Sequence, residues 1–513
     1  MFTDDYHRYI ADAQDALDRG EHERCLQLTD AVPVGPTSTY AATLLLRGRA
    51  LLARDPIRAI ATLKEGIALI SDAPEAHIEA RCLLGRAYTF TDQPEAAEHT
   101  LRQALADATA RSSCRLAAYA AFNLATLFCI THFLNDAEIY AQQAALDQDP
   151  LAQARAKAVT SWIRAEHGDN AGQLALARQA LRDVQSSKRK DAALEASLIE
   201  VLAAVGTNLC DEESVATAWL ATNALRWPRE LRASEFQTYR ALATAAALVG
   251  DWFNMERRLR HAITLAPSPA WEAFAHLELA RLLRASDNRS WIVELAIAED
   301  LAADVDWQSV RGEQQEAVLL FIELYASVDS GKAATYTGIY HTAARLESRN
   351  GARSSGRHDA KAAFAQGMLF KTDGETYLAG KMLRRAWETF DRIGYVWRAC
   401  ESALEALDIC APGESYEWLS RANRILTVAP KSWLSQRLAK RSERPQHRDV
   451  HLNPGPARVR ELLAAGKTPN EVCAALKLSR NTINKHVAVI KRSYGVATLP
   501  QLLAALALQR TAS

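Results

Sequence analysis

The chain has 513 residues, of which 49% are hydrophobic and 24% are charged. This composition is typical of a folded soluble protein and argues against extensive disorder, and the length predicts more than one structural unit. The acidic N-terminus does not resemble a secretory signal, and no run of about eighteen apolar residues predicts a membrane span. The eight cysteines are scattered without a CxxC pair, so we expect free thiols in a reducing cytoplasm.

Charge is distributed unevenly along the chain, although the formal net charge is zero. Residues 440–513 hold thirteen Lys and Arg against four Asp and Glu, a net of +9. The whole chain holds 61 of each sign, so the remaining 48 basic and 57 acidic residues give residues 1–439 a net of −9. A basic tail on an acidic body indicates a polyanionic partner for the tail.

Residues 1 to about 435 predict helices throughout, because Ala and Leu recur at three- and four-residue spacing and strand signals are nearly absent. A second period places small residues where the two helices of a hairpin would approach closely, as at Gly85, Ala97 and Ala104, while larger residues such as Leu101 would fill the gap to the next hairpin. Further copies include Ala125, Ala137 and Ala144; Gly367, Phe370, Ala379, Leu383 and Ala386; and weaker ones at Gly48, at Ala243, Ala262 and Pro267, and at Ala403 and Ala422.

This spacing resembles the tetratricopeptide repeat, with units that vary from about 34 to about 42 residues. The resemblance implies an all-α fold in which about ten or eleven hairpins stack into an α-solenoid with a concave inner surface. We assign residues 1–436 to this repeat domain, as a sensor or interaction domain. The polar run at residues 349–357 predicts a long loop between repeats, or alternatively a hinge between two halves of the solenoid.

Signatures of catalysis and of cofactor binding are missing from the sequence. No GxxxxGK[ST], HExxH or GxSxG motif occurs, and Gly331-Lys332 lacks the rest of a phosphate-binding loop. Five histidines lie singly in helical patterns, where surface or hydrogen-bonded side chains are more usual than metal ligands: His7, His77, His99, His132 and His261. We therefore expect no enzyme activity, no catalytic residue, no cofactor and no metal.

Six tryptophans gather in one stretch of the chain: Trp219, Trp227, Trp252, Trp271, Trp291 and Trp307. One interpretation is packing between neighbouring repeats. The alternative is an aromatic ligand groove on the concave face. The sequence leaves both open.

The helical pattern changes near the C-terminus. The polar segment 441–449 and the tripeptide Pro454-Gly455-Pro456 predict a linker over residues 437–456, because proline disrupts a helix interior. A small domain is then expected over residues 457–513. Its first helix would bury Val459, Leu462 and Leu463 and end at Gly466.

The second helix of this domain carries a strong start signal. Thr468 is expected to cap it, with Pro469 at the first helical position and Glu471 completing a capping box. Its inward-facing residues would be Val472, Ala475 and Leu476. Lys477-Leu478-Ser479 predicts a three-residue turn, with Leu478 buried and Ser479 capping the next helix.

The third helix is expected to bury Ile483, Val487 and Ile490. Its other face is basic and rich in amides: Arg480, Asn481, Asn484, Lys485, Lys491 and Arg492. Gly495 would end it, and a final apolar helix is expected from Leu499 to about Gln509. Two short helices joined by a three-residue turn, with a basic second helix, fit the major groove of double-stranded DNA.

These residues resemble the LuxR-type helix-turn-helix family over about sixty residues. The positions in register are Leu452, Pro454, Leu462-Leu463, Gly466, Glu471-Val472, Leu478-Ser479, Thr482-Ile483, His486-Val487 and Gly495-Val496. The sequence departs from the family at Pro456, Cys473 and Ala488. The resemblance implies that the DNA contacts come from Arg480, Asn481, Thr482, Asn484, Lys485, His486, Ala488, Lys491 and Arg492. It also implies a homodimer through the final helix, with a stripe of Leu499, Leu502, Leu503 and Leu506.

The repeats just before this segment, around residues 386–399, look like those of large ATP-dependent LuxR-type regulators, whose nucleotide-binding module this sequence lacks. We therefore expect a cytoplasmic bacterial transcriptional regulator without a membrane contact. Its repeat domain would receive a small-molecule, peptide or protein signal. The alternative is a tetratricopeptide scaffold or adaptor that binds a partner protein.

Overall fold

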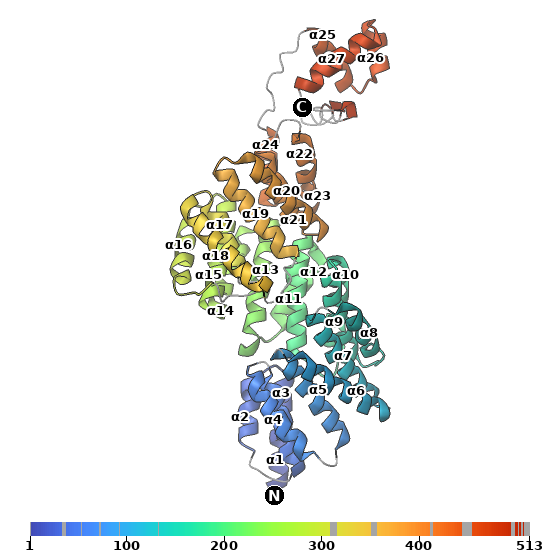
Figure 1. The fold of residues 1–513 in the computed structure, drawn as a ribbon, viewed down its shortest axis with the longest axis vertical. Helices are drawn as coiled ribbons and strands as arrows, with labels where there is room; N and C mark the ends of the chain where they lie inside the picture. The colour runs from blue at the N-terminus through green and yellow to red at the C-terminus, as the bar shows by residue number, and fades with distance from the viewer. Residues whose placement is uncertain are drawn as a thin grey trace. The chain divides into compact units, whose positions relative to one another are not determined.

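The computed structural model describes residues 2–32, 37–52, 54–70, 73–91, 93–131, 133–307, 315–349, 356–410, 414–443, 454–493, 498–500, 502, 503 and 506. Within these ranges the side chains of residues 2–7, 37, 38, 344, 346–349, 442, 443, 492 and 493 are not described. The described residues form α-helices and one short 3-10 helix and contain no strand (Figure 1). The all-α prediction is therefore confirmed.

The chain divides into two compact units, one of residues 1–245 and 253–268 and the other of residues 246–252 and 269–513. The first holds α1 (Phe2–Asp18), α2 (His22–Asp30), α3 (Thr37–Leu51), α4 (Pro56–Leu69), α5 (Pro74–Phe90), α6 (Pro94–Ala110), α7 (Cys114–Ile130), α8 (Leu134–Ala144), α9 (Pro150–Glu166), α10 (Asn170–Ser186), α11 (Ala192–Leu209), α12 (Glu212–Ala224) and η1 (Arg229–Leu231), with most of α13 (Arg232–Leu248) and α14 (Trp252–Leu265).

The second unit holds α15 (Pro269–Ala285), α16 (Trp291–Ala302), α17 (Gln315–Tyr325), α18 (Ser330–Arg349), α19 (Gly356–Thr372), α20 (Thr376–Arg392), α21 (Val396–Leu407), α22 (Ser415–Asn423), α23 (Ile425–Val428), α24 (Trp433–Glu443), α25 (Pro454–Ala464), α26 (Pro469–Leu476) and α27 (Arg480–Ser493). Residues 1–436 were expected to form one repeat domain. The border between the two compact units falls within residues 245–269, away from the polar run at 349–357 that was considered as a hinge. Of that run, residues 350–355 lie outside the described residues.

Consecutive helices pack as hairpins in both units, and short start signals delimit them. In the first unit α3 pairs with α4, α5 with α6, α7 with α8 and α9 with α10. Proline occupies the first turn of α4, α5, α6 and α9, where its missing N–H is not needed. Aspartate side chains cap α4 and α9 to α12 by accepting a backbone N–H.

The small residues of the repeated pattern lie where two helices touch. A Cβ added at Gly367 would stand 2.8 Å from Cγ of Leu383 on the facing helix, and one added at Gly48 would stand 2.5 Å from Cδ2 of Leu63. A Cβ at Gly85 would overlap Leu101 in the same way. The sequence prediction of close approach at these positions is thus confirmed, because no larger side chain fits there.

The tryptophans between residues 219 and 307 do not converge on one groove. In the first unit the Arg258 guanidinium covers the ring of Trp219 at 4.2 Å, and Trp227 Nε1 donates to the carbonyl of Thr222 at 3.0 Å. In the second unit Trp307 is buried in the core and Trp271 packs against it. Most of these rings therefore fill spaces between helices, and Trp252 borders a cleft.

Helix α11 is long and apolar enough to cross a membrane, which the sequence analysis did not anticipate. Half of it is buried inside the protein, where Leu198, Ile199 and Leu202 join the core formed with α9, α10 and α12. A core helix of a water-soluble protein has the same composition. The described residues are therefore compatible with a soluble protein.

Helices extend into the predicted linker over residues 437–456 from both ends. Helix α24 continues to Glu443, and its basic side chains pair with acidic residues at the end of α21: Arg437 with Glu405, and Arg441 at 2.5 Å with Asp408, the residue that follows α21. Helix α25 begins at Pro454 and includes Pro456, which is buried. Proline is harmless there because the first turn of a helix leaves its N–H groups without a partner in the helix.

Candidate nucleic-acid interface

Helix α25 provides the support for the C-terminal helices. Val459 and Leu463 are buried on one side of it, and Leu462 packs partly against the same core, as the sequence predicted. The chain leaves the helix through Gly466, whose φ of +83° lies in the left-handed region that glycine adopts without strain. This sharp exit leads directly to the start of α26.

Helix α26 begins with the predicted capping box. The backbone N–H of Glu471 donates to Oγ1 of Thr468 at 3.4 Å, and the backbone N–H of Thr468 donates to Oε2 of Glu471 at 2.6 Å. The hydrogen bonds from the Thr468 backbone and hydroxyl lower the pKa of Glu471. Pro469 occupies the first helical position, so α26 has a single well-defined start.

The turn between α26 and α27 has the predicted length but not all of the predicted burial. Lys477 adopts a φ of +54°, and the Ser479 hydroxyl accepts the backbone N–H of Thr482 at 3.2 Å, which caps α27. The expected buried plug, Leu478, is 36% exposed. Ala475 is also exposed rather than inward-facing. The reason is that α26 has only eight residues, and Val472 with the partly buried Cys473 and Leu476 suffices to dock so short a helix.

The apolar face of α27 docks on these helices. Ile483 and Ile490 are fully buried and Val487 nearly so, in one core with Val459 of α25 and Val472 of α26. Three apolar residues at spacings of four and three fix the rotation of α27 about its axis. The opposite face of the helix is thereby presented to solvent.

The exposed face of α27 carries most of the residues predicted to contact DNA. Arg480, Asn481, Asn484, Lys485 and Ala488 are all exposed. The Arg480 guanidinium donates to the side-chain carbonyl of Asn470 in the first turn of α26, a contact that the sequence analysis did not anticipate. In the sequence, the sign of this contact was that the second residue of α26 and the first residue of α27 are both polar. The turn between the helices brings the two side chains together.

Other predicted contact residues hold positions that are less open. Thr482 is half-buried, and its hydroxyl lies 2.9 Å from that of Ser479. His486 is half-buried too, and a Cβ at Gly455 would stand 3.0 Å from its ring, so the imidazole packs against the start of α25. Lys491 is half-buried, and the Arg492 side chain lies outside the described residues. Thr482 and His486 thus lie between the helices, beside the exposed face.

The predicted leucine stripe after α27 faces the protein's own core. Leu502 is fully buried and Leu506 nearly so, with Ile483 and Val459 among their neighbours, and Leu499 and Leu503 pack partly against the same core. A dimer that leaves this core intact has to use other side chains of the segment. Most of residues 494–513, including Gly495 and Gln509, lie outside the described residues.

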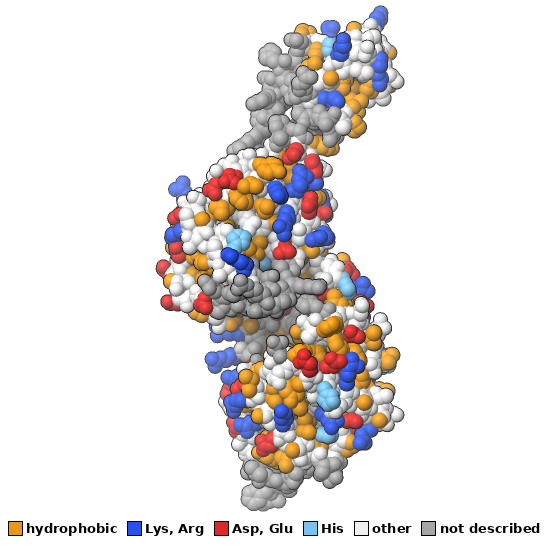
Figure 2. Space-filling model, viewed as in Figure 1, with side chains coloured by type: hydrophobic (Ala, Val, Ile, Leu, Met, Phe, Trp, Pro, Cys, Tyr) orange, Lys and Arg blue, Asp and Glu red, His pale blue; other side chains and the backbone are white. Residues whose placement is uncertain are grey.

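The charge of these helices is strongly positive. Residues 454–493 contain eight Lys and Arg against two Glu, and no Asp. Figure 2 shows Lys and Arg side chains over α25 to α27 on the face in view. Within the described part of the chain no cluster of three or more His, Cys, Asp and Glu could hold a metal ion. The geometry therefore suits recognition of an anionic partner by polar and cationic side chains.

The sequence matches no protein-family model and no curated protein.

Proposed function

We propose that the chain is a sequence-specific DNA-binding transcriptional regulator, with α26, the three-residue turn and α27 as a LuxR-type helix-turn-helix. The observation that supports this most directly is the division of α27 into two faces. Ile483, Val487 and Ile490 anchor one face, while Asn484 and Lys485 stand on the exposed one. A recognition helix needs this arrangement to dock on its domain and reach base edges at the same time.

The exposed side chains match the chemistry of the major groove. Asn484 can hydrogen-bond an adenine on two atoms, and Lys485 and Arg480 can donate to the acceptors of guanine. Lys491 and Arg492, near the end of α27, are assigned to phosphates, which fix register rather than sequence. The excess of basic residues over residues 440–513 supplies the long-range attraction to the DNA backbone.

The remainder of the chain is assigned to signal reception. We propose that the helical hairpins of both units belong to a tetratricopeptide-like solenoid, since Gly48, Gly85 and Gly367 mark the same close helix contact at intervals along the chain. In this account the protein acts in the cytoplasm as a homodimer on double-stranded DNA. A signal bound to the solenoid would then alter access to, or pairing of, the C-terminal helices.

Mapping of bound genomic sites tests this function. The intact chain should enrich a recurrent sequence, and a chain that ends at Glu443, the last residue of α24, should lose that enrichment while keeping its helical content. Binding of the intact protein to the enriched duplex should weaken steeply as salt rises, because counterions are released from the phosphates. Equal enrichment by both chains would contradict the assignment of α25 to α27.

A scaffold that binds a partner protein is the second candidate. The observation in its favour is a set of exposed apolar side chains at the ends of α5 and α7, just before α8 and on α8: Phe90, Ile130, Phe133 and Ile139. Apolar surface of this kind is common at protein–protein interfaces. This candidate predicts that a chain ending at Glu443 retains the biological activity together with a stable partner, whereas the regulator requires the C-terminal helices.

A further inference from the structure

A polar cleft of about 660 Å³ opens in the second unit between α15, α17, α19, α21 and α24. This volume lies in the range of small-molecule sites. Five cationic side chains line it (Arg281, Arg284, Lys371, Arg437 and Lys440) together with four acidic ones (Asp287, Glu323, Glu401 and Glu405). The cleft is therefore rich in charge, and its properties depend on which charges are already paired.

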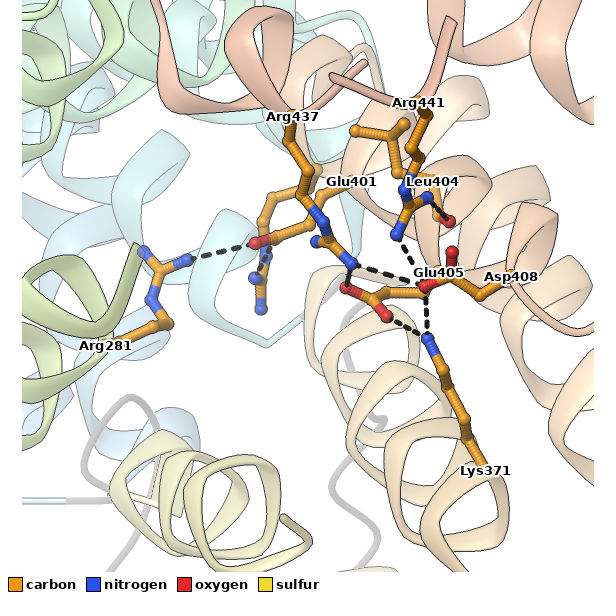
Figure 3. A network of polar contacts seen from close by, with 9 residues as sticks. Arg281, Lys371, Glu401, Leu404, Glu405, Asp408, Arg437 and Arg441 are labelled. Atoms are coloured by element: carbon orange, nitrogen blue, oxygen red, sulfur yellow. Dashed lines mark hydrogen bonds and ion pairs between the residues drawn. The ribbon is translucent and has the colours of Figure 1, made fainter. Parts of the chain in front are cut away.

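One end of the cleft is internally neutralised, as Figure 3 shows. Lys371 Nζ lies 2.6 Å from Glu405 and 2.7 Å from Asp408, and Arg437 pairs with Glu405 as well. Burial alone would raise the pKa of Glu405, but Arg437 and Lys371 outweigh burial and lower that pKa to about 2. These carboxylates are committed to partners, so they offer little to a ligand.

The opposite side of the cleft leaves a buried cation with spare hydrogen-bonding capacity. Arg281 is 8% exposed, and among the described residues neither its Nε nor its Nη1 has a hydrogen-bond partner. Its nearest carboxylate is Glu401, 3.8 Å from Nη1, and Figure 3 shows the guanidinium directed toward it. Glu401 in turn accepts a hydrogen bond from Arg398. Buried guanidinium N–H groups without hydrogen-bond partners, such as those on Nε and Nη1 of Arg281, are costly unless another acceptor completes them.

Arg284 adds a second cation one helical turn along α15. It is half-buried at the cleft, and its guanidinium lies 5.6 Å from the centre of the Trp291 ring. No ion pair is formed by Arg284 among the described side chains. Positions separated by three residues share a helix face, so Arg281 and Arg284 can address one anionic group together.

An aromatic wall completes the cleft. The rings of Trp252 and Trp433, which both line the cleft, lie 6.2 Å apart, and the buried Trp397, which does not line it, supports Trp433 edge-on at 5.8 Å. Phe364 and Met368 of α19 line the same space. Flat apolar surfaces beside paired guanidinium groups suit a planar ring that bears a negative charge.

We propose that this cleft binds a small organic anion, a carboxylate or phosphate carried on an aromatic or heteroaromatic ring, with Arg281 and Arg284 holding the anionic group and Trp252 and Trp433 the ring. The binding of the anion does not depend on the proposed function; only its effect on DNA binding rests on that function. Helix α24 contributes Trp433, Arg437 and Lys440 to the cleft and is the last described helix before α25. A ligand in the cleft would therefore touch the element that leads into the DNA-binding segment.

Calorimetric titration of the full chain with two matched probe pairs tests the site. The pairs are indole-3-acetate with indole-3-acetamide, and adenosine monophosphate with adenosine. The first pair tests whether the site prefers a carboxylate, and the second tests whether it prefers a phosphate. At least one anion should bind about tenfold or more tightly than its neutral partner, the effect of one charge-assisted hydrogen bond.

The variants locate the effect. Arg284→Ala should abolish the preference for the anion, whereas Arg289→Ala, an exposed cation on the adjoining loop that does not line the cleft, should leave it unchanged. Arg281→Lys keeps the positive charge but loses the planar guanidinium, which can donate two hydrogen bonds to one anion. It should weaken binding of the anion while the chain keeps its helical circular dichroism. Equal affinity for anions and neutral analogues, including no binding of any probe at millimolar concentration, would overturn the proposal. An equal loss in Arg284→Ala and Arg289→Ala would overturn it as well.

Measuring DNA binding in the absence of any probe shows whether the cleft proposal and the proposed function stand or fall independently. If the intact chain enriches a DNA sequence but shows no preference for the anions, the cleft proposal fails and the regulator stands. If the anions bind through Arg284 and no DNA sequence is enriched, the regulator fails and the cleft remains a ligand site.

Discussion

Thr468 and Glu471 cap each other at the start of α26: the Thr468 backbone N–H lies 2.6 Å from Glu471 Oε2, and the Glu471 backbone N–H lies 3.4 Å from Thr468 Oγ1. The pair fixes where α26 begins after the sharp exit from α25 at Gly466. Because α26 has only eight residues and one fully buried side chain, Val472, its position depends strongly on this cap.

Thr468→Ala should destabilise the C-terminal helices by about 1 kcal/mol, since it removes an acceptor for one of the first helical N–H groups. Amide hydrogen exchange in α26 should accelerate accordingly. Lys467→Ala, an exposed substitution one residue earlier, is the control and should leave exchange in α26 nearly unchanged. Equal exchange rates in the Thr468 variant and the wild type would contradict the role of the cap.

The same pair predicts a direction of pH dependence. The hydrogen bonds from Thr468 lower the folded-state pKa of Glu471, so the contribution of this carboxylate is present above its unfolded pKa and disappears as the pH falls through the folded value. The protection of α26 amides, taken relative to the intrinsic exchange rate at each pH, should therefore fall in the wild type on acidification below about pH 4.5. Thr468→Ala should show a weaker fall over that interval.

Two glycines of the α19–α20 hairpin should respond to the same substitution with opposite signs. Gly367→Ala places a methyl 2.8 Å from Leu383 Cγ, and we expect it to destabilise the chain by about 1–3 kcal/mol through overpacking. Gly380→Ala meets nothing within 4 Å and should stabilise α20 by about 0.5–1 kcal/mol. Thermal or urea unfolding of the two variants measures both effects, and a neutral Gly367→Ala would refute the close helix contact.

Glu405 should contribute to acid sensitivity of the second unit. Its folded pKa is about 2, below the ordinary value of 4.5, so its stabilisation is present above pH 4.5 and is lost between pH 4.5 and 2. Glu405→Gln should cost roughly 3 kcal/mol at neutral pH and remove that part of the pH dependence. Glu417→Gln, an exposed ion-pair partner, should cost less than about 1 kcal/mol. The free energy of unfolding of the wild type and of both variants, measured at pH 7 and at pH 3, tests this prediction.

The sequence was informative wherever local chemistry determines the structure. The box formed by Thr468 and Glu471, the glycine at residue 466 and the cap at Ser479 each act within a few residues, so spacing alone predicted them. The close approach of Gly367 to Leu383 followed from the repeated pattern of small residues in the same way. The all-α fold needed only the helical period.

Features that depend on tertiary partners were not predictable. Leu478 was expected to be buried, but its exposure depends on how little of the short helix α26 contacts its neighbours. The helix beyond Arg437 was taken for a linker because its polar and basic residues resemble a solvated segment. Its pairing partner, Asp408 at the end of α21, becomes visible beside Arg441 only in the structure. Arg281 and Trp433 are 152 positions apart, and no local pattern places them on one cleft.

Substitutions on α27 should separate base recognition from phosphate binding. Asn484→Ala and Lys485→Ala should each relax sequence preference, by about 1–3 kcal/mol of discrimination for a good base contact. Lys491→Ala should weaken binding to all duplexes alike and reduce the salt dependence by about one charge. Fluorescence anisotropy with a preferred and a scrambled duplex at several salt concentrations distinguishes the two outcomes. A uniform loss in all three variants would contradict base recognition by Asn484 and Lys485.

Selection of random duplex DNA by the full chain tests the central claim most directly. The proposal predicts that the wild type enriches a defined sequence, both without ligand and with indole-3-acetate or adenosine monophosphate present. The double variant Asn484→Ala, Lys485→Ala should enrich a degenerate version or none, while the matched variant Arg289→Ala should return the wild-type sequence. Failure of the wild type to enrich any sequence under all of these conditions would contradict a DNA-reading function for α27.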